Sequence, residues 1–199
     1  MTNKGPYLKP LNRADVPELE PIFEMTEGYL GFSANDVLTM ARLPAATKAF
    51  MEFAITVISE ATLPPQLIQL ITLIASAASG CRYCTAHTAN CCNSAGVDAE
   101  KIAAVWEFAT SPLFDDRERA ALDFAFKAAQ SPSALEQSDY DHMQNYFNET
   151  EVTEILFVVS EMGFFNRWND SVATTLEQKP LEFSKEKLPE EHWQVGKHV

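Results

Sequence analysis

The chain has 199 residues, which is enough for one domain with a hydrophobic core that needs no disulfide bonds. Its 15 Lys and Arg against 28 Asp and Glu give a formal net charge of -13, so the protein's field repels phosphate backbones and anionic lipids. With 46% hydrophobic and 22% charged residues, the composition is typical of a globular protein and excludes a mainly disordered one. We therefore expect neither nucleic acid nor membrane among its partners.

The start of the chain and its cysteines indicate the compartment. Residues 1–15 contain no apolar run of signal-peptide length. The most apolar stretch, residues 67–78, is shorter than the roughly 20 residues needed to cross a bilayer, and we interpret it as a buried helix. All four cysteines fall within residues 81–92, whereas a secreted disulfide framework would spread them along the chain. We therefore expect a cytoplasmic protein that uses its cysteines for redox chemistry or metal binding.

Apolar residues recur at three- and four-residue spacing through most of the chain, which predicts an all-α fold. We expect one compact helical domain over residues 1–180, made of N-terminal helices (1–62) and a core with the remaining helices (63–180). Residues 181–199 are expected to form a charged, frayed tail. The expected helices cover residues 17–29, 33–42, 44–61, 64–80, 81–95, 98–109, 115–130, 138–147 and 150–176.

Several of these boundaries carry recognisable signals. Ser33 followed by Asp36 is an acidic variant of a capping box, and Asp115 followed by Glu118 is a second capping box. Gly80 offers a C-terminal stop for the buried helix that precedes it. The cysteine segment therefore begins at the start of a new helix.

Cys81, Cys84 and His87 form the motif with the clearest chemistry. Two helical cysteines three residues apart have Cα atoms about 5 to 6 Å apart, within reach of a disulfide bond. At a helix N-terminus, unpaired N–H groups and the helix dipole lower the pKa of a thiol and raise its thiolate fraction. His87 lies on the same face one turn later and can accept or return a proton. Arg82, between the thiols, is interpreted as a solvated side chain.

Other interpretations of the cluster stay open. Helical cysteines are often small buried apolar residues. A structural zinc site needs four ligands around the ion, which one continuous helix cannot supply. Cys91 is about 10 Å along the helix from Cys84, too far for a disulfide bond, so we interpret Cys91 and Cys92 as packing residues, with oxidation as the alternative. The chain offers three more histidines, all expected at the surface: His142, His192 and His198.

The segment from residue 63 to His87, with its Gly-Cys-Arg-Tyr-Cys sequence at residues 80–84, resembles the carboxymuconolactone decarboxylase superfamily, in its alkyl hydroperoxidase D-like (AhpD-like) branch. Residues 106–108, 117–122 and 166–170 are also similar to peroxidase-related members. The resemblance implies an all-helical AhpD-like bundle, assembly into homo-oligomers (trimers or hexamers), and thiol-dependent reduction of hydroperoxides by an external dithiol or lipoyl-type reductant. Members that decarboxylate muconolactones lack the cysteine pair, so decarboxylation is disfavoured.

The chain departs from that family pattern at two positions. Gln69 stands twelve residues before the first cysteine, where the family has a proton-relaying Glu, and His87 follows the second cysteine by three residues instead of four. Because glutamine cannot act as a base, another carboxylate or a path through water and His87 alone must replace it. We choose Glu118, although its capping box also explains it. The other candidates are Glu107, Glu154 and Glu161.

The resulting hypothesis is a thiol peroxidase without a bound metal or organic cofactor. Helix position alone favours Cys81 as the more acidic thiol, whereas the nearness of His87 and the resemblance favour Cys84 as the nucleophile. Cys84 would attack the peroxide, Cys81 would close the disulfide, and His87 would carry the proton. The alternatives are a disulfide-exchange or redox-sensing protein without peroxide specificity, and a non-enzymatic oligomeric binding protein. Residues 166–170, rich in polar side chains, are interpreted as helix packing more than as a substrate pocket.

Overall fold

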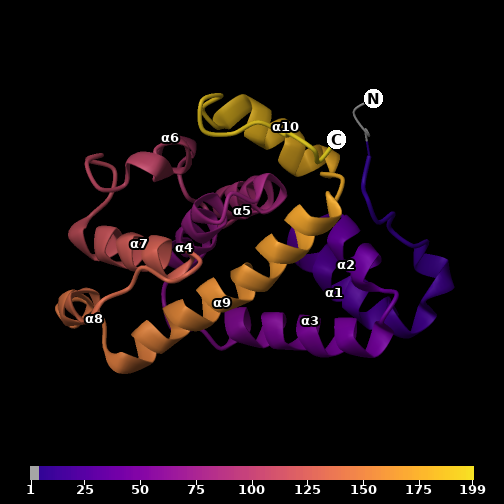
Figure 1. Cartoon of the computed structure of the whole chain (residues 1–199), viewed down its shortest axis with the longest axis horizontal. Coiled ribbons are helices and arrows are strands. Elements are labelled where there is room, and N and C mark those ends of the chain that lie inside the picture. Colours follow the sequence, from indigo (N-terminus) through magenta and orange to yellow (C-terminus); the bar gives the residue numbers. More distant parts are fainter. Residues whose placement is uncertain (1–4) are drawn as a thin grey trace.

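The structure, a computed structural model, describes residues 5–199. Residues 1–4, which belong to the predicted domain and to the N-terminal segment assessed for a signal peptide, lie outside the described residues. Within these residues there are helices and no strands, which confirms the all-α prediction (Figure 1). No helix in this range combines the length and hydropathy needed to cross a bilayer. The helices are α1 (Glu20–Leu30), α2 (Asn35–Met40), α3 (Pro44–Ser59), α4 (Pro65–Ala78), α5 (Arg82–Ser94), α6 (Ala99–Ala103), α7 (Asp116–Ala128), α8 (Gln137–Met143), α9 (Glu149–Val172) and α10 (Gln178–Lys187), with short 3-10 helices at Arg13–Asp15, Pro17–Leu19 and Val105–Glu107.

Helix α4 is the centre of the core. Every residue from Leu67 to Ser76 is buried, including the polar Gln69, Thr72 and Ser76, because α4 packs against α5, α7 and α9. Burying each Leu or Ile side chain here contributes about 1.5 to 3 kcal/mol to the free energy of unfolding. The buried helix expected from the sequence is therefore confirmed.

The long helix α9 joins two hydrophobic clusters. The larger contains buried residues between Leu63 and Trp193, and the smaller lies between Val16 and Met51 in the N-terminal helices. Phe165 on α9 packs against both. In Figure 1, α9 runs diagonally between α1–α3 on one side and α6–α8 on the other. A space between the two clusters is where the candidate site lies.

Most predicted boundaries agree with the structure. The capping box of Asp115 and Glu118 is confirmed, with both reciprocal hydrogen bonds present. The one expected at Ser33 is wrong, because α2 begins after Ala34 and no side chain caps it. The predicted helix 98–109 is interrupted after Ala103, and its remainder is a 3-10 turn. The predicted helix 150–176 ends at Val172, because Ala173 adopts the left-handed region with φ +51°.

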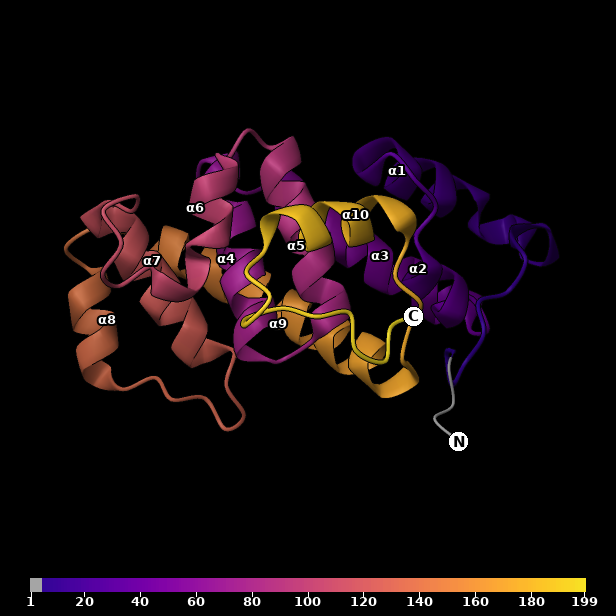
Figure 2. The same ribbon diagram turned by 90° about the horizontal axis from the view of Figure 1, so that it is seen from above.

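The C-terminal segment differs from the frayed tail that we expect from its charge. Helix α10 packs against α5 (Figure 2). The segment after it buries Leu188, Trp193 and His198. The indole N–H of Trp193 donates to the backbone carbonyl of Arg82 at 2.8 Å. The few apolar residues of this segment therefore outweigh its charge, because they cover the start of the cysteine helix.

Candidate functional site

The cysteine pair lies at the start of α5, directly after the turn that ends α4. Gly80 adopts φ +72°, a left-handed conformation that ends α4 and that glycine accepts without strain. Cys81 is the N-cap of α5, and its Sγ accepts a hydrogen bond from the backbone N–H of Cys84 at 3.3 Å. Both thiols are free and buried, with exposed fractions of 0% for Cys81 and 2% for Cys84. The predicted helix start is confirmed.

A cavity of about 320 Å³ opens beside Cys84. Helices α4, α5 and α9 form its inner wall, and α1, α2 and α3 cover it from the opposite side. Its lining is mostly apolar, and Cys84 and His87 are among the lining residues whereas Cys81 is not. A molecule in the cavity therefore meets the sulfur of Cys84 first, with Cys81 behind it.

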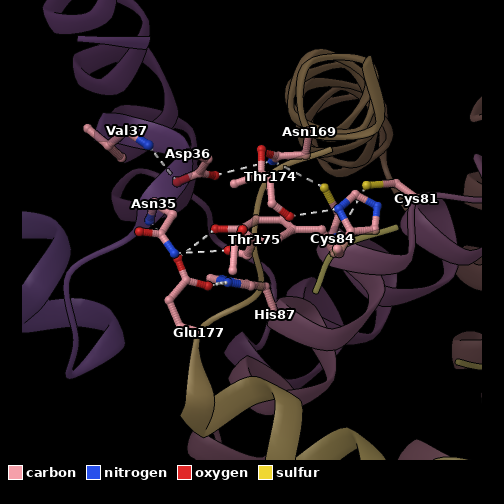
Figure 3. A network of polar contacts seen from close by, with 12 residues as sticks. Asn35, Asp36, Val37, Cys81, Cys84, His87, Asn169, Thr174, Thr175 and Glu177 are labelled. Atoms are coloured by element: carbon pink, nitrogen blue, oxygen red, sulfur yellow. Dashed lines mark hydrogen bonds and ion pairs between the residues drawn. The ribbon is translucent and has the colours of Figure 1, made fainter. Parts of the chain in front are cut away.

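Asn169 on α9 holds the Cys84 side of the cavity. Its Nδ2 donates to Sγ of Cys84 at 3.5 Å and to Oδ2 of Asp36 at 3.3 Å (Figure 3). The hydroxyl of Thr174 donates to Asn169 Oδ1 at 2.7 Å, which fixes the orientation of the amide. The left-handed turn at Ala173 places Thr174 for this contact. The predicted segment 166–170 therefore contributes to the site as well as to packing.

His87 is paired with a carboxylate that the sequence hypothesis did not include. Nε2 of His87 lies 2.5 Å from Oε2 of Glu177, and both side chains are nearly buried. The other oxygen of Glu177 accepts hydrogen bonds from the Tyr83 hydroxyl at 2.9 Å and from the backbone N–H of Asn35 at 2.5 Å. Tyr83 also stacks on the imidazole of His87, with ring centroids 4.3 Å apart. Glu177 is therefore a carboxylate partner of His87 that the sequence hypothesis lacked.

Burial and charge shift the pKa values of this site in different directions. Burial disfavours the charged imidazole, but Glu177 and Asp36 outweigh it and raise the pKa of His87. Burial opposes the ionised form of Glu177, yet His87 and the surrounding N–H groups lower its pKa. Burial raises the pKa of Asp36, which His87 and Asn169 only partly offset. The resulting pair favours a charged imidazole beside a carboxylate.

The thiol of Cys84 differs from the expectation that a helix N-terminus makes a thiol more acidic. Burial raises its pKa well above the usual value, and the neighbouring Cys81 adds to the rise. The hydrogen bond from Asn169 acts in the opposite direction. Burial therefore favours the protonated thiol of Cys84.

Glu118, our chosen relay residue, is not brought to this site. It caps α7 through the backbone N–H of Asp115 and pairs with Lys101 at 2.5 Å, away from the cavity lining. Glu107 is exposed, and Glu154 accepts hydrogen bonds from the loop at Thr62. The capping role therefore prevails for Glu118. Of the four candidates, the cavity is lined by Glu161.

The remaining sequence candidates divide between surface and interior. Gln69 is buried in the cavity wall and donates to the hydroxyl of Tyr29 at 2.8 Å. Arg82 is exposed, as predicted. Cys92 packs in the core, as predicted, whereas Cys91 is partly buried and lines the cavity. The exposed positions of His142 and His192 are confirmed, and that of His198 is wrong, because the C-terminal segment buries it. Within residues 5–199, no three His, Cys, Asp or Glu side chains converge as metal ligands.

Comparison with known proteins places the chain among relatives. Residues 44–127 match the carboxymuconolactone decarboxylase family. A solved structure of the debrominase Bmp8 holds a cysteine-to-alanine variant in complex with 2,3,4-tribromopyrrole. Its sequence is 35% identical to this chain, and the two structures match with a TM-score of 0.85 over 90% of this chain and 96% of that one. This chain belongs to the carboxymuconolactone decarboxylase superfamily. Its fold is that of the AhpD-like branch.

Two further relatives have no established activity in their descriptions. An uncharacterized peroxidase-related protein from Ralstonia eutropha JMP134, described as an alkylhydroperoxidase AhpD core, is 18% identical, with a TM-score of 0.80 over 93% of this chain and 98% of that one. The uncharacterized protein YnjA of Escherichia coli (strain K12) is 27% identical over 74 residues, or 37% of this chain. The matched region spans 41% of that protein. At 18% identity, the likeness to the Ralstonia protein supports the fold alone.

Proposed function

We propose that this protein is a dithiol reductase of small apolar electrophiles. One observation carries the proposal: Cys84 lines the cavity while its backbone N–H contacts the sulfur of Cys81 behind it. This order suits a thiol that attacks a molecule in the cavity and a second thiol that then closes on the first. Cavities of about 300 Å³ and upward take small organic molecules, so the cavity is large enough for such a substrate.

The first half of the reaction makes Cys84 a nucleophile. When the imidazole of His87 is neutral, it takes the proton of the Cys84 thiol one turn away, and its raised pKa favours the proton remaining there beside Glu177. The amide of Asn169 donates to the resulting thiolate. The sulfur attacks the electrophilic atom, the bond from that atom to the rest of the substrate breaks, and the departing group takes up a proton.

The second half restores neutral products. The Cys81 sulfur attacks Sγ of Cys84, the bond from Cys84 to the captured atom breaks, and a disulfide forms. Substrate is reduced by two electrons, and the two thiols supply both electrons and both protons. We further propose that an external dithiol, including a lipoyl-type donor, reduces the disulfide, and that the protein acts as a trimer or hexamer in the cytoplasm.

Two substrate classes fit this scheme. With an organic hydroperoxide, the captured atom is oxygen and the products are an alcohol, water and the disulfide. With a brominated aromatic ring, the captured atom is bromine and the products are the ring with hydrogen in its place, hydrogen bromide and the disulfide. The hydroperoxide follows from the family resemblance. We favour the halogenated ring, because the likeness to the debrominase is 35% over nearly the whole chain.

Thiol counting on the full-length protein tests the proposal. The reduced protein is treated without oxygen with one equivalent of 2,3,4-tribromopyrrole or cumene hydroperoxide, and mass spectrometry locates the new bond. We expect two thiols lost per bromide released, with the bond between Cys81 and Cys84. Faster oxidation of the same pair by the hydroperoxide would favour peroxidase function. Oxidation confined to Cys91 and Cys92, or no oxidation by either compound, would refute the dithiol mechanism.

The Cys81→Ser and Cys84→Ser variants assign the two roles. We expect Cys81→Ser to release one product and retain a modified Cys84, and Cys84→Ser to be inactive. A trapped adduct found only in Cys84→Ser would reverse the assignment. Turnover of a model disulfide without turnover of either substrate would instead support the disulfide-exchange alternative.

A further inference from the structure

Glu161 is a buried acid in the cavity wall. It lies on α9, is 7% exposed, and its Oε2 is buried with no hydrogen-bond partner among residues 5–199. The lining also contains the apolar residues Met162 and Phe165 on the same helix and Ile58 on α3. A buried polar atom without a hydrogen-bond partner lowers the free energy of unfolding, so the position of Glu161 calls for an explanation.

Glu161 lies at the opposite end of the cavity from the thiol. It precedes Asn169, which contacts Cys84, by eight residues, or about 12 Å along the helix axis. Near Glu161 are Tyr29 and Gln69: burial raises the pKa of Tyr29, and the charges of Cys91 and Glu161 add to this rise. The cavity therefore has Cys84 and Asn169 at one end, and Glu161 with Tyr29 and Cys91 at the other.

The free oxygen of Glu161 suits a hydrogen-bond donor. Burial raises the pKa of Glu161 to about 8, so both protonation states are accessible near neutral pH. An N–H or O–H group on a ligand can donate to a carboxyl oxygen in either state, whereas a ligand acceptor is served only by the protonated acid. The missing partner is therefore best supplied by a donor on a bound molecule.

We propose that Glu161 accepts a hydrogen bond from a ring N–H of the substrate and so directs the opposite side of the ring toward Cys84. This inference rests on the proposed function, because it takes the reducible molecule to lie between the two ends of the cavity. Glu161 is then a positioning residue that selects halogenated N–H heteroaromatic rings. It takes no part in the bond changes at sulfur.

The test measures binding without chemistry. In full-length Cys84→Ala protein, calorimetry compares 2,3,4-tribromopyrrole with its N-methyl derivative, which has no N–H. We expect about tenfold weaker binding of the N–H compound after Glu161→Leu, and little change after Glu161→Gln, which keeps an acceptor of similar size. The N-methyl derivative should bind all three proteins equally weakly. The unfolding temperature of each variant verifies that it is folded.

The proposed hydrogen bond from the substrate N–H to Glu161 is called the anchor, and each outcome has one meaning for it. No binding of tribromopyrrole, or equal loss of both compounds in Glu161→Leu, would overturn it. Thiol oxidation by the same compound in protein that retains both cysteines reports the proposed function separately. If N–H-dependent binding occurs without oxidation of Cys81 and Cys84, the anchor stands and the reductase proposal fails. If oxidation proceeds equally fast in Glu161→Leu, the reductase stands and the anchor fails.

Discussion

The carboxylate of Glu177 lies 2.5 Å from Nε2 of His87, although 90 residues separate them in the chain. The chain reaches this contact because α9 ends at the left-handed Ala173, after which the backbone leads Glu177 to the start of α10. The contact gives the histidine of the cysteine helix a fixed orientation and a counter-charge. Loss of that carboxylate should therefore change the titration of His87 more than it changes the fold.

In Glu177→Gln, we expect the pKa of His87 to fall, because burial then acts with less opposition. Because the pKa of His87 is raised in the folded state, its protonation stabilises the fold at pH values below the unfolded pKa of 6.5. This stabilisation is lost as the pH rises through the folded pKa. Because the pKa of Glu177 is lowered in the folded state, its ionisation stabilises the fold at pH values above the unfolded pKa of 4.5. This stabilisation is lost as the pH falls through the folded pKa. The variant should lose most stability, about 2 kcal/mol, between these two values.

Denaturant unfolding at several pH values and NMR titration of His87 measure these effects. Glu182→Gln, an exposed position on the same helix, is the control and should change neither. A His87 pKa that is the same in Glu177→Gln and in the unaltered protein would contradict the pairing.

Asn169→Leu should make the Cys84 thiol less reactive. The amide of Asn169 donates to Sγ of Cys84 and lowers its pKa, so its loss should slow alkylation of Cys84 at neutral pH by about tenfold. Iodoacetamide labelling followed by peptide mass spectrometry measures the rate at this one cysteine.

Asn166→Leu is the matched control for that experiment. Asn166 is buried on the same helix, and neither polar atom of its side chain has a partner among the described residues. Its replacement should leave the reactivity of Cys84 unchanged and raise the unfolding temperature. Equal slowing in both variants would mean that α9 packing, and not the Asn169 hydrogen bond, controls the thiol.

Glu118→Gln should affect stability and leave the thiol chemistry intact. The variant weakens the capping box at Asp115 and the pair with Lys101, at a cost of about 1 kcal/mol. Thermal unfolding measures this loss, and Cys84 alkylation measures reactivity. A large drop in reactivity at unchanged stability would return Glu118 to the site.

Trp193→Ala should loosen the start of the cysteine helix. The indole is buried and donates to the carbonyl of Arg82, so truncation should cost about 3 kcal/mol of the free energy of unfolding. Hydrogen exchange should increase at the first turn of α5. Trp193→Phe keeps a ring and loses the N–H, so its hydrogen exchange should lie between that of the unaltered protein and that of Trp193→Ala. Unchanged exchange in Trp193→Ala would show that the C-terminal segment does not support α5.

Local patterns in the sequence were enough to predict much of this molecule. The spacing of apolar residues predicted α4, and Gly80 predicted the turn that places Cys81 at the start of α5. These features depend on neighbours within a few residues, which a sequence displays directly. The same holds for the capping box at Asp115. The interruption after Ala103 has no such signal.

The polar network could not be predicted in the same way. Glu177 reaches His87, and Asp36 reaches Asn169, across large separations in the chain, and a carboxylate at a helix start looks the same whether it meets solvent or imidazole. The acidity of Cys84 was mispredicted because the helix dipole is visible in a sequence and burial is not. The polar run at residues 166–170 was the available signal, since polar residues on a buried helix face need partners.

The position of Cys81 behind Cys84 limits how electrons can return. Both sulfurs of the pair are shielded from solvent, and of these two cysteines Cys84 is the one that lines the cavity. A donor must therefore bring its thiol on a narrow side arm into the cavity after the product has left. Substrate and donor would then enter through the same opening of the cavity, and binding of one would exclude the other. Steady-state rates measured at several concentrations of both substrate and donor should give the parallel double-reciprocal lines of a ping-pong mechanism. Excess substrate should slow the reduction of the disulfide by the donor.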